Sequence, residues 1–378
     1  MAVLVVLAIP LFSITLGQPD NGTNPTSDSN RQAYDLISQG FGVGVNGPLT
    51  VVVKLPDQSS SANSSLLSGM QSDIAKTAGV ASVTPAAVNS AGTTAVFNVI
   101  PATRPQAQQT TALANTLRDD VLPKEKATSY VTGTTAGSVD FTSQITSRLA
   151  WLILAVVAIS FLLLTTAFRS VVIATKAAIL NILSIGAAYG VIVAIFQWGW
   201  GKSLIGLQST LPVPAYVPML VFCIVFGLSM DYEVFLLSQV HEAWLATRDA
   251  HRAVAIGISA TARVITTAAA IMIVVFVSFV LDPDPTVKML AIGMAFAVLI
   301  DASLVRMCLV PSIMSLLGSR AWWMPRWLEP VVPQLHLEDS AAAVASPEPA
   351  LADAGGHPAG PPAAHVRPGS RPDQARRP

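Results

Sequence analysis

Residues 149–168, LAWLILAVVAISFLLLTTAF, contain no charge and decide what kind of fold this chain adopts. A helix rises about 1.5 Å per residue, so twenty such residues cross a hydrocarbon core of about 30 Å. Four more apolar runs follow, at residues 171–197, 215–239, 257–281 and 288–317. Because buried helices of a large soluble protein do not explain five such runs, we expect an α-helical polytopic membrane domain over residues 148–319.

The composition of the whole chain agrees with a membrane protein. Of its 378 residues, 52% are hydrophobic and only 12% are charged, whereas soluble domains average about 25% charged residues. Basic and acidic residues number 22 each, so the chain lacks the basic surface that a nucleic-acid partner requires. There is no Walker A motif, and the five histidines are scattered. We therefore expect a protein that is not an enzyme and needs no ATP, metal or cofactor.

The two cysteines, Cys223 and Cys308, both lie within apolar runs. This position predicts small packing residues rather than a disulfide framework or a zinc site.

Residues 1–17 form an apolar stretch that is shorter than the roughly 20 residues of a spanning helix. It has no basic segment at its start, and its end resembles a signal-peptidase site only weakly. We expect a first transmembrane helix that is truncated at its cytoplasmic end, which makes six spans. A degenerate signal peptide is the alternative.

Residues 18–147 are polar and rich in Ser, Thr, Asn and Gln, which predicts one water-exposed domain. A short helix is expected at residues 34–39. After it, the pattern predicts strands at 49–55, 80–84, 93–100 and 129–132, and helices at 62–78 and 106–121. This is the β-α-β-β-α-β order of a ferredoxin-like unit, so the expected fold of this porter-like domain is α+β.

Basic residues in short loops predict the orientation of the chain in the membrane. With residues 18–147 outside, three basic residues fall on the outer side: Arg148, Lys202 and Lys288. Seven fall on the cytoplasmic side: Arg169, Lys176, Arg248, Arg252, Arg263, Arg320 and Arg326. We therefore expect a multi-pass protein of the cell membrane with both termini cytoplasmic and residues 18–147 extracytoplasmic.

The chain after the last apolar run is expected to remain on the cytoplasmic side. Trp322, Trp323 and Trp327 alternate with arginines there, which predicts an interfacial segment on the inner leaflet over residues 320–339. Residues 340–378 are rich in Ala, Pro and Gly and predict a disordered cytoplasmic tail.

The candidate functional residues are charges and hydroxyls inside the apolar runs. Asp231 and Tyr232 occur in the segment GLSMDYEVF, and Asp301 and Arg306 in DASLVR. An ionisable group at mid-bilayer costs at least about 3 kcal/mol, so it normally faces the bundle interior and has a function. Burial disfavours an ionised carboxylate, which suits Asp231 to bind and release protons, and the Tyr232 hydroxyl can relay them. Arg306 keeps its charge and suits a fixed countercharge.

Structural roles are the alternative for several of these residues. Asp301 and Arg306 could form an ion pair that only holds the bundle together. Residues five apart lie about 140° apart on an α-helix, so each of the two is expected to contact another helix instead. Glu233 projects to a different face from Asp231 and is expected to have a structural or interfacial role.

The run at residues 171–197 carries two packing signals. Asn181 is expected to form a hydrogen bond with a neighbouring helix. Gly186 and Gly190 form a small-xxx-small motif, which lets another helix approach closely.

Several segments resemble the C-terminal membrane half of MMPL proteins of the RND superfamily, in their actinobacterial form. They are GLSMDYEVFLLS at 227–238, VITTAAAIM at 264–272 and DASLVR at 301–306. AYDL at 33–36, GFG at 40–42 and NGPL at 46–49 resemble the start of the second outer domain of that family. Trp322 and Trp323, followed by PRW at 325–327, resemble the end of its membrane region.

The resemblance implies an exporter that is driven by the proton gradient and moves lipids or other hydrophobic compounds outward through the lipid membrane. It implies that Asp231 and Tyr232 form half of an intramembrane proton relay, for which Asp301 and Arg306 are also needed. Complete family members have two such halves. We therefore expect a second transporter half, supplied by missing N-terminal sequence, a separate chain or a second copy. A membrane-anchored interaction protein that does not transport is the alternative.

Overall fold

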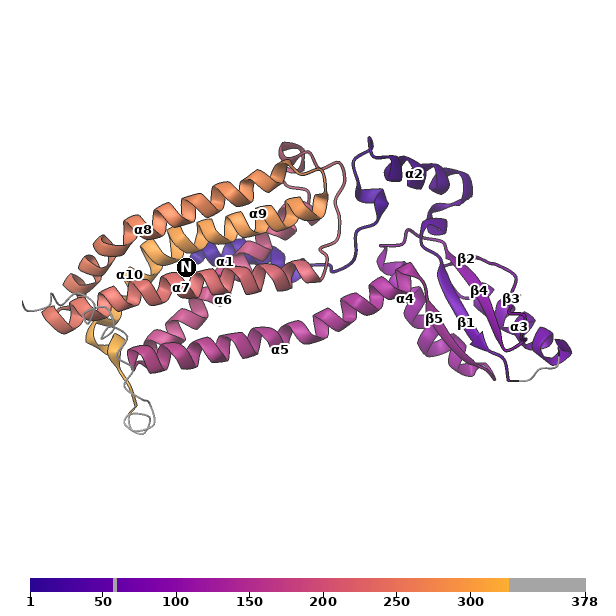
Figure 1. Ribbon diagram of the computed structural model, residues 1–378, viewed down its shortest axis with the longest axis horizontal. Coiled ribbons are helices and arrows are strands. Elements are labelled where there is room, and N and C mark those ends of the chain that lie inside the picture. Colours follow the sequence, from indigo (N-terminus) through magenta and orange to yellow (C-terminus); the bar gives the residue numbers. More distant parts are fainter. Residues whose placement is uncertain (57–59, 326–378) are drawn as a thin grey trace, which may run out of the picture. The chain divides into compact units, whose positions relative to one another are not determined.

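The computed structural model describes residues 1–56 and 60–325, which form a group of long helices and a small sheet domain (Figure 1). The predicted segment at 320–339 is therefore described only as far as residue 325. Trp327 and the predicted tail at 340–378 lie outside the described residues.

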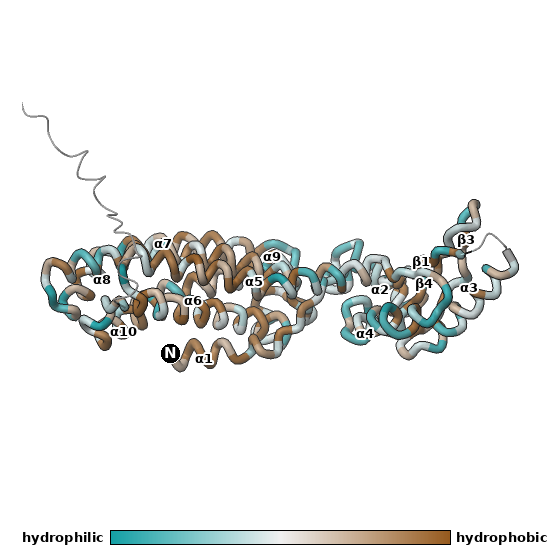
Figure 2. The backbone as a smooth tube through the Cα atoms, turned by 90° about the horizontal axis from the view of Figure 1, so that it is seen from below, coloured by the Kyte–Doolittle hydropathy of each residue, from teal (hydrophilic) through white to brown (hydrophobic). Residues whose placement is uncertain are grey.

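Five helical segments in the described chain are long and apolar enough to cross a membrane, which confirms the five predicted runs. They are Thr134–Phe168, Val171–Gln197, Tyr216–Thr247, Ala250–Leu281 and Pro285–Trp322. The apolar colouring of these helices in Figure 2 contrasts with the mixed colouring of the sheet domain.

The first three membrane helices are α5 (Thr134–Phe168), α6 (Val171–Ile192) and α7 (Tyr216–Thr247). A π-helical turn, η6 (Val193–Gln197), continues α6. The next helix, α8 (Ala250–Ser278), ends in the 3-10 turn η8 (Phe279–Leu281). The last span consists of α9 (Pro285–Ile300), the π-helix η9 (Asp301–Leu309), α10 (Val310–Leu317) and the 3-10 turn η10 (Gly318–Trp322).

The starts of three membrane helices are set by side chains that accept hydrogen bonds from free backbone N–H groups. Ser170 caps α6, Asp249 caps α8 and Asp284 caps α9, with Pro285 in the first turn. Such caps satisfy donors that have no partner within the helix, and proline has no such donor to satisfy.

The α6 helix is the centre of the helix group. Of its most apolar window, 78% is buried, against 11% for α5 and for α8, whose apolar faces are therefore free to meet lipid. The N-terminal segment, α1 (Ala2–Ala8) and η1 (Ile9–Ser13), packs along α6. Gly190 makes this contact possible, because a Cβ at that position would overlap the backbone carbonyl of Leu7.

The sheet domain contains every strand and helix that the sequence predicted there. They are α2 (Ser29–Phe41), β1 (Leu49–Lys54), α3 (Ser60–Ala75), β2 (Val80–Val83), β4 (Thr94–Pro101), α4 (Gln108–Thr116) and β5 (Thr128–Thr132). The predicted second long helix continues beyond α4 as a π-turn, Leu117–Val121. A short strand that was not predicted, β3 (Ala87–Val88), pairs with β4. The strands pair antiparallel in the order β2-β4-β1-β5.

Alternation along β1 places the core of this domain on one face of the sheet. Leu49, Val51 and Val53 are buried and pack in one cluster with Phe97 of β4. Successive side chains of a strand point to opposite faces, so the residues between them are less covered. Side chains of α3 and α4 complete the same cluster, among them Met70, Ile74, Leu113 and Ala114.

The change from polar to apolar sequence does not coincide with the start of a helix. The α5 helix begins at Thr134, directly after β5, and continues without a break to Phe168. The division that the sequence suggested, between residues 147 and 148, therefore lies inside one helix.

Candidate functional site

The π-helix η9 brings Asp301 and Arg306 together. Arg306 Nε donates to Asp301 Oδ2 at 2.8 Å, and both side chains are buried. The prediction that a direct pair within one helix is awkward is therefore wrong here. In a π-helix the backbone hydrogen bonds join residues five apart, so such residues lie on the same face. One element thus supplies both charges.

Ser229 of α7 connects this pair to two other helices. Arg306 Nη2 donates to Ser229 Oγ at 2.8 Å and also to the Ser229 backbone carbonyl. The Ser229 hydroxyl lies 3.1 Å from Asp301 Oδ1 and 2.9 Å from Asn181 Oδ1 of α6. It can donate to only one of these two acceptors at a time. Three helices therefore meet at Ser229, and the expected contacts of Asp301 and Arg306 with another helix are present.

A second pair of buried charges belongs to the same network. Glu233 Oε1 of α7 lies 3.5 Å from Lys176 Nζ of α6. Asn181 Nδ2 donates to Glu233 Oε2 at 3.4 Å. Lys176, Glu233, Asp301 and Arg306 are the buried charged residues of the described chain. Their formal charges cancel, so the cluster is neutral within its apolar surroundings.

Tyr232 and Asp231 project from α7 in different directions. The Tyr232 ring centre lies 5.5 Å from the guanidinium carbon of Arg306, and its hydroxyl donates to the sulfur of Met272 at 3.7 Å. Asp231 is exposed and makes no hydrogen bond or ion pair within residues 1–56 and 60–325. Asp231 is two residues from both Ser229 and Glu233, which is about 200° around a helix. It therefore points away from the buried network, contrary to the expectation that it faces the interior.

Asp231 lies on an exposed stripe along α7. At Gly227, one turn before it, a Cβ would meet no neighbouring atom. The other exposed members are Leu220, Cys223, Ile224 and Phe235. This stripe, which we call the α7 face, is apolar apart from Asp231.

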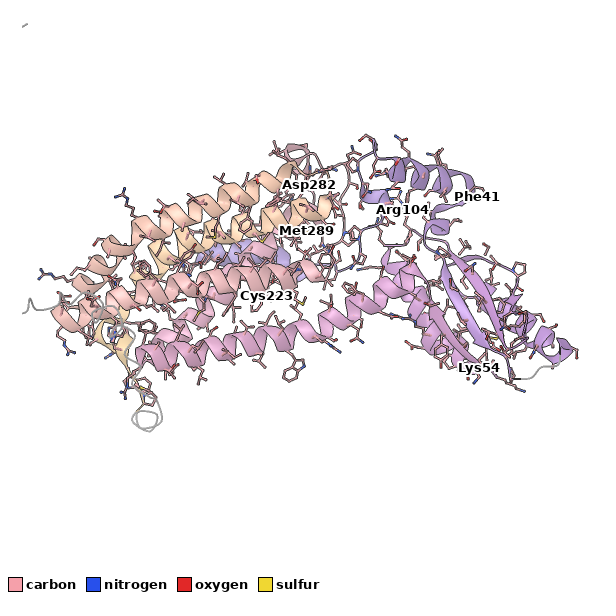
Figure 3. The ribbon with its side chains drawn as sticks, viewed as in Figure 1. Phe41, Lys54, Arg104, Cys223, Asp282 and Met289 are labelled. Atoms are coloured by element: carbon pink, nitrogen blue, oxygen red, sulfur yellow. The ribbon has the colours of Figure 1, made fainter. Side chains whose placement is uncertain are left out.

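The prediction that both cysteines are packing residues is wrong. Cys223, labelled in Figure 3, lies on the α7 face, and Cys308 lies on η9; both are exposed free thiols. An apolar run shows that a helix lies in an apolar environment, but it does not show which of its faces other helices cover.

Ser229, Lys176 and Glu233 were not among the residues predicted to form the site. A usable signal existed for two of them, since Ser229 and Glu233 are four residues apart and therefore share one helix face. Lys176 gave no such signal, because a basic residue near the start of a membrane helix is interpreted as part of the adjoining loop. The predicted bond from Asn181 to a neighbouring helix is confirmed by its contacts with α7.

A separate polar cluster surrounds Asp20, outside the membrane helices. Tyr34 donates its hydroxyl proton to Asp20 Oδ2 at 2.9 Å, while Gln106 Nε2 and the backbone N–H of Gly22 donate to Oδ1 at 3.0 Å. Burial raises the pKa of the Asp20 carboxyl above 3.8, although these hydrogen bonds from Tyr34 and Gly22 and the charge of Arg104 oppose the shift. Asp20 lines a cavity of about 1190 Å³, and residues of α4 and of the first turns of α5 line it as well.

Comparisons with known proteins agree on one family. Residues 25–335 match the profile of the MMPL family. The membrane protein YdfJ of Bacillus subtilis is 34% identical over 336 residues, 89% of this chain and 46% of YdfJ. The mycolic acid-containing lipids exporter MmpL11 of Mycolicibacterium smegmatis is 34% identical over 340 residues, 89% of this chain and 36% of that protein. The heme uptake protein MmpL11 of Mycobacterium tuberculosis is 33% identical over 340 residues, with 89% and 35% covered.

The match extends over most of the described chain. It includes the sheet domain and all four buried charges of the membrane helices. The chain spans less than half the length of these three relatives. With five apolar membrane helices and a matching profile over residues 25–335, the chain belongs to the MMPL family of membrane transporters, within the RND superfamily.

Proposed function

We propose that this chain is one half of an exporter that uses the proton gradient to move lipids or other hydrophobic compounds out of the cell. Asp231 and Tyr232 form this half's part of an intramembrane proton relay. Asp301 binds a proton in the same cycle, and Arg306 is the fixed countercharge that Ser229 and Tyr232 hold in place.

The observation that carries this proposal is the arrangement of charges on the two sides of α7. One side contacts a neutral, fully buried network, and the other presents Asp231 alone on an apolar surface. A carboxylate that faces lipid costs at least about 3 kcal/mol on insertion scales. A second half that covers the α7 face removes this cost and places its own polar groups beside Asp231.

The topology that we propose has six membrane segments, with the N-terminal segment 1–17 as the first. Its close contact with α6 at Gly190 supports a place within the membrane domain. Both termini are cytoplasmic. Because Lys176 is buried, we no longer count it among the basic residues of the cytoplasmic side. Six basic residues then remain on the cytoplasmic side and three on the outer side.

We further propose that residues 18–147 form a ferredoxin-like porter domain on the outer side. The antiparallel order β2-β4-β1-β5, with α3 and α4 completing the core on one face, supports this fold.

The names of two relatives support the proposed substrate class. They refer to the export of mycolic acid-containing lipids and to the uptake of heme, and both compounds contain large apolar parts. We infer that the substrate of the complete transporter is likewise hydrophobic.

Asp231→Asn tests the relay in cells that express the chain from its native locus, where a second half is present. We expect loss of outward transport of the hydrophobic substrate at an unchanged protein level, because the amide cannot bind and release a proton. Asp120→Asn, the same change at an exposed position of the outer domain, is the matched control. Transport that survives Asp231→Asn at an unchanged protein level would remove the relay assignment.

A further inference from the structure

The two buried ion pairs of the membrane domain differ in geometry. Asp301 and Arg306 approach to 2.8 Å, and Arg306 has further acceptors on Ser229. Lys176 Nζ and Glu233 Oε1 are 3.5 Å apart, and neither atom has a hydrogen-bond partner among the described residues, although both are buried. Apart from the bond that Glu233 Oε2 accepts from Asn181 Nδ2 at 3.4 Å, the second pair is therefore a contact of charges with few of the hydrogen bonds that normally stabilise such a pair.

An ion pair with few hydrogen bonds contributes little to the stability of a membrane domain. Taking two charges out of water is costly, and good hydrogen bonds are needed to offset that cost. Lysine also differs from arginine in one property, because its ammonium group can lose a proton whereas a guanidinium does not. Lys176 and Glu233 thus place two groups that can change protonation state in direct contact, whereas the Asp301–Arg306 pair contains only one.

The polar network links this pair to the proposed relay. Asn181 contacts Glu233 through its amide nitrogen and Ser229 through its oxygen, and Ser229 lies 3.1 Å from Asp301. Lys176 is six residues beyond the cap of α6, about 9 Å along the helix. It is therefore the member of the network nearest to the end of α6 that is proposed to be cytoplasmic.

We propose that Lys176 and Glu233 form the cytoplasmic exit of the proton path, an inference that rests on the proposed function. The Glu233 carboxylate binds the proton that leaves Asp301. In the inward-open state the Lys176 ammonium releases a proton to cytoplasmic water and becomes a neutral amine. The Glu233 carboxyl then gives its proton to that amine. The carboxylate and the ammonium are restored, and one proton has moved inward.

The charges that surround this exit suit the transfer. The buried charged residues near Glu233 in the described chain are Lys176, Asp301 and Arg306, and Tyr232 lies beside Arg306. Arg306 keeps its charge throughout. When Asp301 is protonated, the positive charge of Arg306 is uncompensated, which favours release of that proton towards Glu233.

Lys176→Arg separates proton transfer from a structural ion pair. Arginine keeps the positive charge and forms better hydrogen bonds with a carboxylate, so a purely structural role survives the change. We expect transport to fall about 100-fold, since the guanidinium does not release a proton. Lys202→Arg, the same change in an exposed loop, is the control. Transport at the wild-type rate in folded Lys176→Arg protein would overturn the proposal.

A measurement of protonation tests the same pair without transport and without a second half. Infrared difference spectra of the purified chain, recorded on lowering the pH, show the band of each carboxyl that becomes protonated. We expect one such band to disappear in Glu233→Gln and to shift in Lys176→Arg, while Asp231→Asn leaves it in place. A spectrum that Glu233→Gln does not change would overturn the assignment of Glu233 as a proton-binding group.

The two experiments also separate this inference from the proposed function. Should Asp231→Asn leave transport intact, the proton-driven function fails whatever the spectra show. Should Asp231→Asn abolish transport while Lys176→Arg has no effect, the function stands and only the cytoplasmic exit is wrong.

Discussion

At the scale of single residues, Arg306 holds the membrane network together through three different acceptors. Its guanidinium donates to Asp301 and to both the hydroxyl and the backbone carbonyl of Ser229, and the Tyr232 ring covers it. A planar fork with several donors can reach all of these at once, whereas the single ammonium of lysine cannot. The choice of arginine is therefore a structural requirement as well as an electrostatic one.

Replacement of Arg306 by Met is expected to destabilise the membrane domain strongly. The change leaves Asp301 buried without its countercharge, which costs about 3–5 kcal/mol in comparable buried pairs. Unfolding of the purified chain in detergent, followed by intrinsic tryptophan fluorescence, measures the loss. Arg320→Met, at an exposed position, should change stability by less than about 1 kcal/mol. Equal stability of the two variants would contradict the structural role of Arg306.

Asp20 predicts a pH dependence of the outer domain. Its pKa is raised in the folded chain, so the folded state binds this proton more tightly than the unfolded state does. The stability that protonated Asp20 contributes is therefore present below pH 3.8 and is lost as the pH rises through the raised pKa. Denaturant unfolding, followed by circular dichroism, should show the wild type gaining stability relative to Asp20→Asn as the pH falls. A constant difference at every pH would contradict this expectation.

At the scale of elements, the small-xxx-small motif of α6 illustrates how one helix accommodates another. Gly190 touches the backbone of α1, and a Cβ there would overlap the Leu7 carbonyl. Gly186, one turn away, would place its Cβ 3.8 Å from Ala8 and Leu11, which is ordinary contact. The two glycines of one motif thus have different roles, although both lie in the same interface.

Alanine substitutions should separate these two glycines. Gly190→Ala is expected to displace α1 and to lower the thermal stability of the membrane domain, because backbone atoms cannot move aside as a side chain can. Gly186→Ala is the matched control and should be neutral or slightly stabilising, since alanine favours helix by about 1 kcal/mol over glycine. Equal loss of stability in both variants would show that α1 does not pack at Gly190.

The sequence predicts elements better than it predicts their contacts, and α7 and η9 show why. Apolar length identified five helices, an apolar run identified the strand at 49–55, and alternation identified the strand at 93–100, because these signals are local. The pairing of Asp301 with Arg306 depends on a π-helix, which residue spacing on an α-helix does not predict. The burial of Lys176 and the exposure of Asp231 depend on neighbouring helices that are distant in the chain.

At the scale of the whole molecule, the α7 face is a surface that a single chain leaves open. The chain spans 46% of YdfJ and 36% of MmpL11 from M. smegmatis, so the aligned relatives contain more sequence than is present here. The face joins apolar side chains to Asp231, and its exposed Gly227 allows close approach of another helix. These features fit a helix of the second half as the occupant.

Cys223 allows this contact to be tested with a native thiol. A photoreactive maleimide attached to Cys223 in native membranes should produce a crosslinked species larger than the chain of 39.6 kDa. A product of twice this mass that contains only this chain identifies a second copy, and a product that also contains another MMPL-family chain identifies a separate half. Cys223→Ser leaves Cys308 as the only thiol and controls for labelling elsewhere. Absence of any product from Cys223 in cells that transport substrate would contradict the proposed interface.

The unbroken course of α5 has a mechanical consequence. Its 35 residues extend about 50 Å, some 20 Å more than the hydrocarbon core of a membrane. A helix without a hinge transmits rotation and tilt along its axis. In the proposed exporter, a shift of the inner end of α5 would therefore also move β5 and the outer domain. Two glycines inserted between Ser147 and Arg148 would make α5 flexible at that point. In the proposed exporter, proton binding would then remain intact but would no longer be coupled to movement of the outer domain.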